Sequence, residues 1–497
     1  MWRKLPVLIA ALCFSNPVGS GTSPVKRFVV LYSVNNSGYI DVCGCKAKKV
    51  KQGSLSRRYT VVKTVRAEGK PVILLDGGSC FFPIQETLPH PYERNQLRSK
   101  AFVIVESMNR MGYAAMALGS SDLLLGLDVL RELEKEASFP ILCANFLSPN
   151  GKPVFPSHTI VEAGGVKIGI VGLIMGTLNP YYINKVAPGC SVKDPIETAK
   201  RQVAALKDKV DLIFALSHLR KEENQKLAAE VPEISLIFDP NINYGSYSLF
   251  MADPKNYVDR FGSTLVVRAD AEGMRLARID VEFEIPLAPI RTSPELNRLE
   301  RGVSIDPIPD DLVPYLGRGN FNRAVVSRIS IEPHYLADPG IEALIEAWKK
   351  QGPGELSPET LKKLKAATPR YVGKDACKDC HQEQYSFWEK TPHSKAYEAL
   401  RKTGDHQRYD CIGCHTVGFG QAFIDVRDAP KFAGVQCECC HGTNPDHIRD
   451  PEKSPKWAKV TEHTCLVCHN KHQIRIDFDY WAKISSVSCP KMRKAKK

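Results

Sequence analysis

Four copies of the motif Cys-x-x-Cys-His lie in the last quarter of the 497-residue chain. Two thiols at this spacing can reach the two vinyl groups of one porphyrin, and the adjacent histidine can bind its iron as the proximal ligand. The motifs therefore predict covalent attachment of four c-type haems. The attachment residues are Cys377 and Cys380, Cys411 and Cys414, Cys437 and Cys440, and Cys465 and Cys468, with proximal ligands His381, His415, His441 and His469.

Zinc knuckles and disulfides are the alternative uses of such cysteines. A zinc site also uses paired Cys-x-x-Cys motifs, but it gives no reason for a histidine after every second cysteine. The region is also short and polar for a core built from side chains alone, and four haems would supply that core. We therefore predict haem in preference to zinc.

Each iron can take a sixth ligand, and the candidates are the histidines outside the motifs. A second imidazole on an iron is one of the features that set its reduction potential. The candidates are His393, His406, His447, His463 and His472, with the more distant His334.

Charge and composition restrict the class of partner. The formal charge of +13 would be offset by the eight propionates of four haems, so the mature surface need not be strongly basic. We therefore predict no nucleic-acid partner. A length of 497 residues predicts two or three domains.

The first residues are typical of a secretory signal. Arg3 and Lys4 precede an apolar run over residues 5–14, which is too short to span a bilayer, and small residues follow at 19–21. An uncleaved anchor or a buried first strand is the alternative. We predict a signal peptide over 1–22, no transmembrane span in the mature chain, and export to the periplasm or cell surface, where haem attachment and disulfides belong.

The rest of the chain divides by its patterns. Apolar strand-like runs alternate with amphipathic stretches over 25–285, which predicts an α/β domain. Prolines are frequent over 286–320, so we predict a linker over 286–369. This linker is expected to contain short helices, at 340–351 and 356–367. The haem domain is expected at 370–490, mainly α-helical, and a basic tail at 491–497.

The C-terminal region resembles the tetrahaem cytochrome c-554 family. The resemblance implies that His393 and His447 are the best distal ligands. Relatives often carry a histidine where this chain has Ser485 and Ser486, so one haem is expected either to stay five-coordinate or to take His463 or His472. The likeness rests on residues 371–381, 388–397, 440–447 and 480–484.

The N-terminal region resembles the calcineurin-like metallophosphoesterase domain of 5′-nucleotidases and UDP-sugar hydrolases. This resemblance implies a four-layer α/β sandwich, and it rests on residues 74–78, 111–119, 139–146, 165–173 and 216–219. Most metal ligands of that family are replaced, and only His218 remains. The replacing residues are Asn35 and Ser37, Ser79, Ser120 with Ser121 and Asp122, and Asn241 with Asn243.

Neutral side chains cannot supply the anionic charge of a two-metal centre, so we predict no phosphohydrolase activity and assign no second metal site beside the haems. Cys80 follows one replaced position, and Cys43 and Cys45 lie in the loop after the first strand. In the family fold these loops converge, which implies either a disulfide to Cys80 or a thiolate metal site with His218.

Together these patterns predict an exported tetrahaem cytochrome that transfers electrons in a respiratory chain, with an N-terminal domain for docking. Redox partner proteins are expected, and membership of a larger cytochrome complex stays open. Two alternatives belong to other classes. One is a reductase of a small oxyanion or nitrogen species at an open haem, and the other is an active nucleotide phosphohydrolase fused to a cytochrome.

Overall fold

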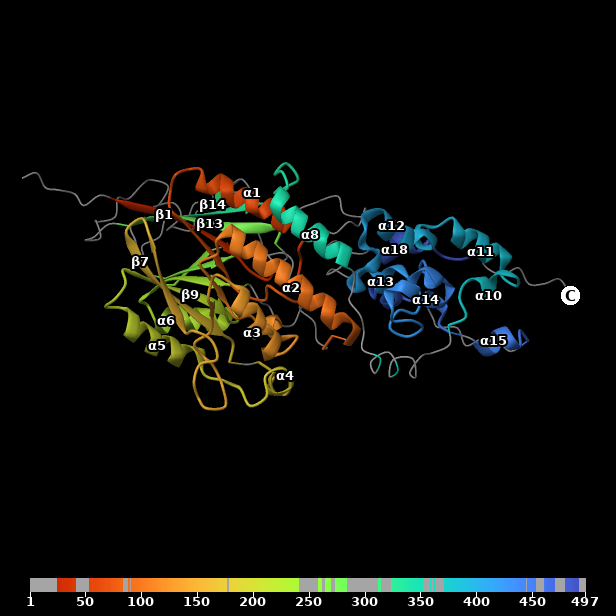
Figure 1. Ribbon diagram of the computed structural model, residues 1–497, viewed down its shortest axis with the longest axis horizontal. Helices are drawn as coiled ribbons and strands as arrows, with labels where there is room; N and C mark the ends of the chain where they lie inside the picture. The colour runs from red at the N-terminus through yellow and green to blue at the C-terminus, as the bar shows by residue number, and fades with distance from the viewer. Residues whose placement is uncertain are drawn as a thin grey trace, which may run out of the picture.

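The computed structural model shows an N-terminal α/β part and a C-terminal helical part (Figure 1). Among the residues it describes, no helix has both the length and the apolar character needed to cross a bilayer. The described residues are 25–41, 53–83, 88–89, 91–176, 178–240, 258–261, 264–269, 273–283, 312–313, 323–351, 358, 362, 371–443, 445–452, 460–469 and 479–490.

Two sheets form the centre of the N-terminal part. The first has seven strands in the order β14-β15-β13-β1-β2-β3-β4, of which β1 to β4 are parallel. Its strands are β1 (Lys26–Ser33), β2 (Val72–Asp76), β3 (Ala115–Ala117), β4 (Ile141–Leu142), β13 (Arg275–Phe283), β14 (Leu312–Val313) and β15 (Arg323–Ser330).

The second sheet has six strands in the order β11-β12-β10-β9-β7-β6, and its four central strands are parallel. A separate pair joins β5 (Phe146–Leu147) to β8 (Ser191–Val192). The strands of the second sheet are β6 (His158–Ala163), β7 (Val166–Ile174), β9 (Leu212–His218), β10 (Ile234–Asp239), β11 (Val258–Phe261) and β12 (Thr264–Arg268).

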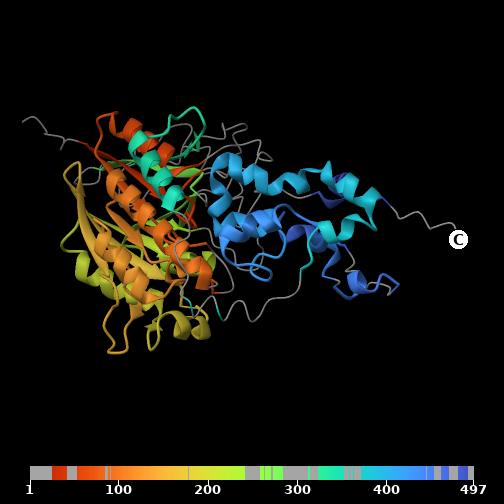
Figure 2. The ribbon, with the colours of Figure 1, turned by 45° about the vertical axis from the view of Figure 1, so that its right-hand side comes forward.

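Alternation of side chains along the strands builds four layers. Phe28 and Val30 of β1 pack between the two sheets, whereas Val29 and Leu31 face the helices. Helices therefore cover the outer face of each sheet, and the predicted four-layer sandwich is confirmed (Figures 1 and 2). The helices are α1 (Leu55–Arg66), α2 (Pro91–Met111), α3 (Leu127–Glu136), α4 (Pro180–Val186), α5 (Pro195–Leu206), α6 (Lys221–Glu230) and α8 (Pro339–Gln351).

The segment predicted as a linker contains three elements of the N-terminal part, namely β14, β15 and α8. β15 pairs with β13 along its whole length, and α8 buries Ile341, Ile345 and Trp348 against the helices of the first sheet. The predicted helix at 340–351 corresponds to α8, while most of the one at 356–367 lies outside the described residues. The N-terminal fold thus continues to residue 351.

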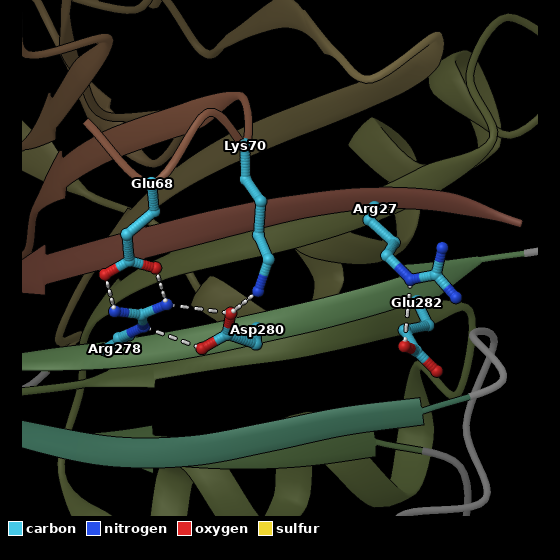
Figure 3. Close-up of polar contacts among 6 residues, drawn as sticks. All are labelled: Arg27, Glu68, Lys70, Arg278, Asp280 and Glu282. Atoms are coloured by element: carbon cyan, nitrogen blue, oxygen red, sulfur yellow. Dashed lines mark hydrogen bonds and ion pairs between the residues drawn. The ribbon is translucent and has the colours of Figure 1, made fainter. Parts of the chain in front are cut away.

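A row of ion pairs joins the turn after α1 to β13 (Figure 3). Arg278 of β13 donates two hydrogen bonds to the Glu68 carboxylate, and it also pairs with Asp280 at 2.7 Å. Lys70 reaches the same Asp280 at 2.8 Å, and Arg27 of β1 pairs with Glu282 at 3.1 Å. Ion pairs that remain in contact with solvent contribute about 0–1 kcal/mol each, so this row adds little to stability.

The C-terminal part consists of short helices joined by turns, as predicted, and its apolar core is small. Eight buried residues between Tyr397 and Ala429 form its one described cluster. No described residue beyond Glu438 is buried. The helices are α10 (Asp375–Lys378), α11 (Gln382–Glu389), α12 (Ala396–Thr403), α13 (Tyr409–His415), α14 (Cys437–His441), α15 (Pro445–Arg449), α16 (Glu462–Leu466) and α18 (Tyr480–Ile484).

Candidate functional site

Each Cys-x-x-Cys-His motif lies in or beside a short helix. In the first motif the His381 amide donates to the Cys377 carbonyl at 3.0 Å, and in the fourth the His469 amide donates to Cys465 at 2.8 Å. One helical turn therefore separates the first cysteine from the histidine, which puts both side chains on the same side of the helix. This local geometry suits two thioether bonds and one axial ligand on a single haem.

Two histidines from outside the motifs lie opposite motif histidines. The ring centres of His381 and His447 are 6.3 Å apart, and those of His393 and His469 are 6.1 Å apart. Imidazole nitrogens bind first-row metals at about 2 Å, so two rings on opposite sides of one iron have centres roughly 6 Å apart. Both pairs thus have the separation that a six-coordinate iron requires.

A backbone carbonyl orients the histidine of the second motif. Nδ1 of His415 lies 2.7 Å from the Ala396 carbonyl oxygen. A carbonyl only accepts hydrogen bonds, so Nδ1 carries the proton and donates it, which leaves Nε2 as the free lone pair. Metal-ligating histidines are oriented in this way by a partner on their other nitrogen.

The thiols bring the motifs together in pairs. The Cys377 thiol is hydrogen-bonded to Cys437, which lowers the pKa of Cys377 and raises that of Cys437. A hydrogen bond with Cys414 likewise lowers the pKa of Cys468. The first motif is therefore beside the third, and the second beside the fourth.

The motif histidines follow the same pairing. Burial lowers the pKa of His441, and the neighbouring His381 lowers it further. Burial also lowers the pKa of His469, with a smaller contribution from His415. Two independent sets of side chains thus group the motifs in the same way.

The remaining candidate ligands are placed differently. His463 is exposed on α16, and His406 meets the edge of the Tyr397 ring at 6.4 Å. His334 packs on Tyr335 in the N-terminal part, and His472 lies outside the described residues. Assignments of distal ligands to the second and third motifs stay predictions.

The other candidate site lies where parallel strands of both sheets end. Asp122, in the short 3-10 helix Ser120–Leu123 that follows β3, is fully buried, and its carboxylate accepts four backbone hydrogen bonds. The donors are the amides of Ser79, Cys80, Phe81 and Gly119, at 2.8–3.0 Å. Both carboxylate oxygens are therefore occupied by the protein's own backbone.

His218 is also engaged within the protein. Its Nδ1 donates to the Gly77 carbonyl at 3.1 Å, so its Nε2 is an acceptor. The Ser79 hydroxyl lies 3.2 Å from Nε2, and the Ser120 hydroxyl lies 3.5 Å from it. The surviving histidine thus has serine hydroxyls where the resembling family has metal ligands.

Two other replaced positions, Asn35 and Ser37, bond to the chain as well. The Asn35 amide donates to the Pro240 carbonyl at 2.8 Å, and the Ser37 hydroxyl donates to the Asn35 carbonyl at 3.1 Å. Asn241 and Asn243 lie outside the described residues. Hydrogen bonds thus hold the described loops in place.

A buried arginine lies beneath this cluster, and the sequence analysis did not assign it a site role. Arg58 is 1% exposed and donates to the Asn36 side chain at 2.6 Å and to the Tyr113 hydroxyl at 3.3 Å. The Ser33 hydroxyl links Tyr113 to Asp76, at 2.8 and 2.6 Å. The signal for burial was present, because Arg58 is three residues after Leu55 on the apolar face of α1.

Cys80 is a free, buried thiol in this structure, 3.7 Å from the Met108 sulfur. The disulfide to Cys43 or Cys45 stays a prediction. Cys43 and Cys45 lie outside the described residues. Burial raises the pKa of the Cys80 thiol well above its usual value, so Cys80 is a neutral thiol here.

We expect His218 to make the N-terminal part less stable in acid. Burial lowers the pKa of His218 to about 4. In the unfolded chain His218 therefore takes up a proton near pH 6.5, whereas in the folded chain it stays neutral. Stability is lost as the pH falls from 6.5 to 4. The shift corresponds to about 3 kcal/mol. His218→Gln should remove this loss, as measured by urea unfolding with hydrogen exchange of the β9 amides.

Asp76 and Asp122 titrate in the opposite sense. Burial raises their pKa values to about 6 and about 7, so protonation stabilises the folded chain as the pH falls. Asp76 and Asp122 are present in the natural chain and in His218→Gln alike. The difference in the free energy of unfolding between these two proteins therefore reports on His218 alone. A difference that does not change between pH 7 and pH 4 would contradict the assignment.

Comparison with known proteins bears on both parts of the chain. The family model for cytochrome c554 and c-prime matches residues 376–442, a range that contains the first three motifs. The 5′-nucleotidase of Vibrio vulnificus is 27% identical over 320 residues, which cover 59% of this chain and 53% of the relative. That of Vibrio cholerae is 31% identical over 189 residues, covering 36% and 32%.

The chain thus spans about half the length of these curated relatives or less. Among solved structures, a 5′-nucleotidase precursor from Thermus thermophilus aligns with a TM-score of 0.49 and 22% identity, covering 65% of this chain and 59% of that one. The calcineurin-like phosphoesterase YfkN from Bacillus subtilis has a TM-score of 0.47 and 18% identity, covering 66% and 98%. The predicted resemblance of each part to its family is confirmed.

Proposed function

We propose that this chain is an exported c-type cytochrome that carries four haems and transfers electrons between redox partner proteins. The observation that carries the proposal is the placement of two histidine pairs at a six-coordinate separation, 6.3 and 6.1 Å, within a segment that holds four attachment motifs. The similarity of residues 376–442 to the cytochrome c554 family supports it independently.

The residues divide into attachment, proximal and distal groups. The motif cysteines would hold each haem covalently, and the motif histidines would bind its iron from one side. His447 would be the sixth ligand of the first haem iron, and His393 would be the sixth ligand of the fourth. The bound haem supplies one-electron chemistry, and the protein's contribution is to hold the ligands, exclude water and bring neighbouring motifs close together.

The pairing of motifs supports transfer within the chain. Since the first motif is beside the third and the second beside the fourth, electrons would enter one pair and leave through the same or the other pair. We assign the protein to the periplasm or cell surface, because haem attachment of this type belongs outside the cytoplasm.

The N-terminal part would serve for docking. Its loops at the ends of β2 and β3 are held by Asp122, and its surviving His218 is bonded to Ser79. This arrangement supports a scaffold rather than a hydrolase, although the fold is the one that 5′-nucleotidases use.

A reductase is the second candidate, and one observation favours it. The family histidine after α18 is replaced by Ser485 and Ser486, and the Ser486 hydroxyl donates to the Lys483 carbonyl at 2.7 Å. A haem that lacks this ligand would present an open iron face. Carbon monoxide binding by one reduced haem, with the others inert, would support this candidate.

Substitution of the two proposed distal ligands tests the electron-transfer assignment. His447→Met and His393→Met should each alter the spectrum of one haem and raise its midpoint potential, because methionine in place of the second imidazole favours the ferrous state. The changes should belong to different haems. Spectropotentiometric titration of the full-length protein measures them.

His334→Met provides the control, because His334 packs on Tyr335 in the N-terminal part. This variant should leave every haem unchanged. A protein with no covalent haem, or one that carries zinc in its place, would overturn the proposal. If neither His393→Met nor His447→Met changes any haem spectrum, the assigned ligands are wrong even if four haems are attached.

A further inference from the structure

One buried side chain of α2 joins the N-terminal part to the C-terminal part by hydrogen bonds. Gln96 is 6% exposed, and its amide bonds to the backbone on both sides of Arg408. Nε2 donates to the Gln407 carbonyl at 3.1 Å, and Oε1 accepts from the Tyr409 amide at 2.7 Å. Tyr409 is the first residue of α13, and the first amides of a helix have no partner within it. Gln96 therefore caps a helix of the other part.

Arg408 adds a second contact between the parts. Its guanidinium lies 5.4 Å from the centre of the Trp348 ring, which is 4% exposed on α8. The ring is fixed in turn by a hydrogen bond from its Nε1 to the Ser99 hydroxyl of α2, at 3.0 Å. Cation–π contacts with a buried ring are stronger than exposed ones. Two helices of the N-terminal part thus hold one turn of the C-terminal part.

The turn that they hold leads directly into the second haem motif. Cys411 is two residues beyond Tyr409, and α13 also carries Cys414 and His415. The Tyr409 ring is buried and stacks on Phe419 with ring centres 5.7 Å apart. Gln96 therefore contacts the attachment helix directly, through the Tyr409 amide.

We propose that Gln96 is the positioning residue through which the N-terminal part encloses the haem of the second motif and sets its midpoint potential. This inference rests on the proposed attachment of haem. Enclosure of one side of a haem lowers the local dielectric and disfavours the more charged ferric state. Opening the contact admits water and lowers the potential of that haem alone, because the other motifs have no described contact with Gln96.

The test uses the full-length protein with its haems. Gln96→Leu keeps the volume of the side chain but removes both hydrogen bonds, and one of the four midpoint potentials should move to a lower value. Gln96→Glu keeps the acceptor for Tyr409, loses the donor to Gln407 and adds a buried carboxylate, so the same single potential should again move to a lower value. Electron paramagnetic resonance and potentiometric titration identify the haem.

Gln202→Leu is the matched control, because Gln202 on α5 makes one hydrogen bond to His158 within the N-terminal part. It should leave all four potentials unchanged. Loss of the second haem alone from Gln96→Leu also supports the inference, since attachment then requires the positioned helix. If Gln96→Leu loses all its haems, Trp348→Leu must lower one of the four midpoint potentials and leave the other three unchanged, or the inference fails.

The outcomes separate this inference from the proposed function. A natural chain without covalent haem overturns the proposed function itself. A natural chain with four haems, and a Gln96→Leu variant with the same four potentials, overturns the inference alone.

Discussion

A chain that carries no haem should lose the fold of its described residues from Cys437 onward and keep that of the N-terminal part. We expect this result when all eight attachment cysteines are replaced by serine. No described residue beyond Glu438 is buried, so the side chains of this region form no core of their own. The N-terminal part has three separate apolar clusters and should unfold cooperatively as before.

Hydrogen exchange with peptide-level resolution measures the effect. Amides of residues 437–469 should exchange at the rate of an unfolded chain, which amounts to a loss of all measurable protection. Residues 397–429 should keep partial protection, because they hold the apolar cluster of this part and are docked on Gln96. Protection at 437–469 equal to that of the haem-loaded protein would contradict this expectation.

The full-length protein should hydrolyse no phosphate ester. Two-metal phosphoesterases work because two cations share a bridging carboxylate and polarise both the water and the phosphoryl oxygens. Here the bridging position is Ser79, whose hydroxyl is bonded to His218, and the carboxylate of Asp122 is occupied by four amides. Enzymatic accelerations start at about a million-fold, and we expect all of this factor to be missing.

The assay uses nucleotides, UDP-glucose and a chromogenic phosphodiester with added manganese, zinc or calcium. A working two-metal phosphoesterase in the same buffers is the positive control. The full chain is required, because β15 and α8 belong to the N-terminal fold and a fragment that ends before residue 323 would lack both. Turnover that disappears in His218→Ala would show that the chain is a hydrolase as well.

The patterns of the sequence were sufficient for the features that depend on local order. Buried parallel strands are apolar over most of their length, so the apolar runs within 25–285 that predicted an α/β domain correspond to strands such as β7 and β9. The haem motifs were recognised because covalent attachment imposes a fixed spacing. His393 and His447 came from the family resemblance, and the structure brings each of them beside a motif histidine.

Features that depend on pairing between distant segments were missed. β15 lies beyond a proline-rich stretch, and only its hydrogen bonds to β13 make it part of the sheet. Asp122 was assigned only as a replacement of a family ligand, because a carboxylate in a sequence does not reveal that backbone amides will occupy it. Gln96 carried no signal at all, since its two partners are main-chain groups that any residues at 407 and 409 would present.

The pairing of β1 with β13 has a consequence for the order in which the molecule can be built. Lys26 is opposite Phe283, so the central strand of the first sheet lacks one neighbour until about 250 further residues have been made. Such a high contact order makes folding slow, but every strand and helix of this sheet, α8 included, precedes Cys377. Synthesis begins at the N-terminus. The surface formed by Gln96 and Trp348, here called the platform, can therefore fold before the last haem motif is made. The platform would then act as a template on which the attachment helix is presented to the maturation machinery.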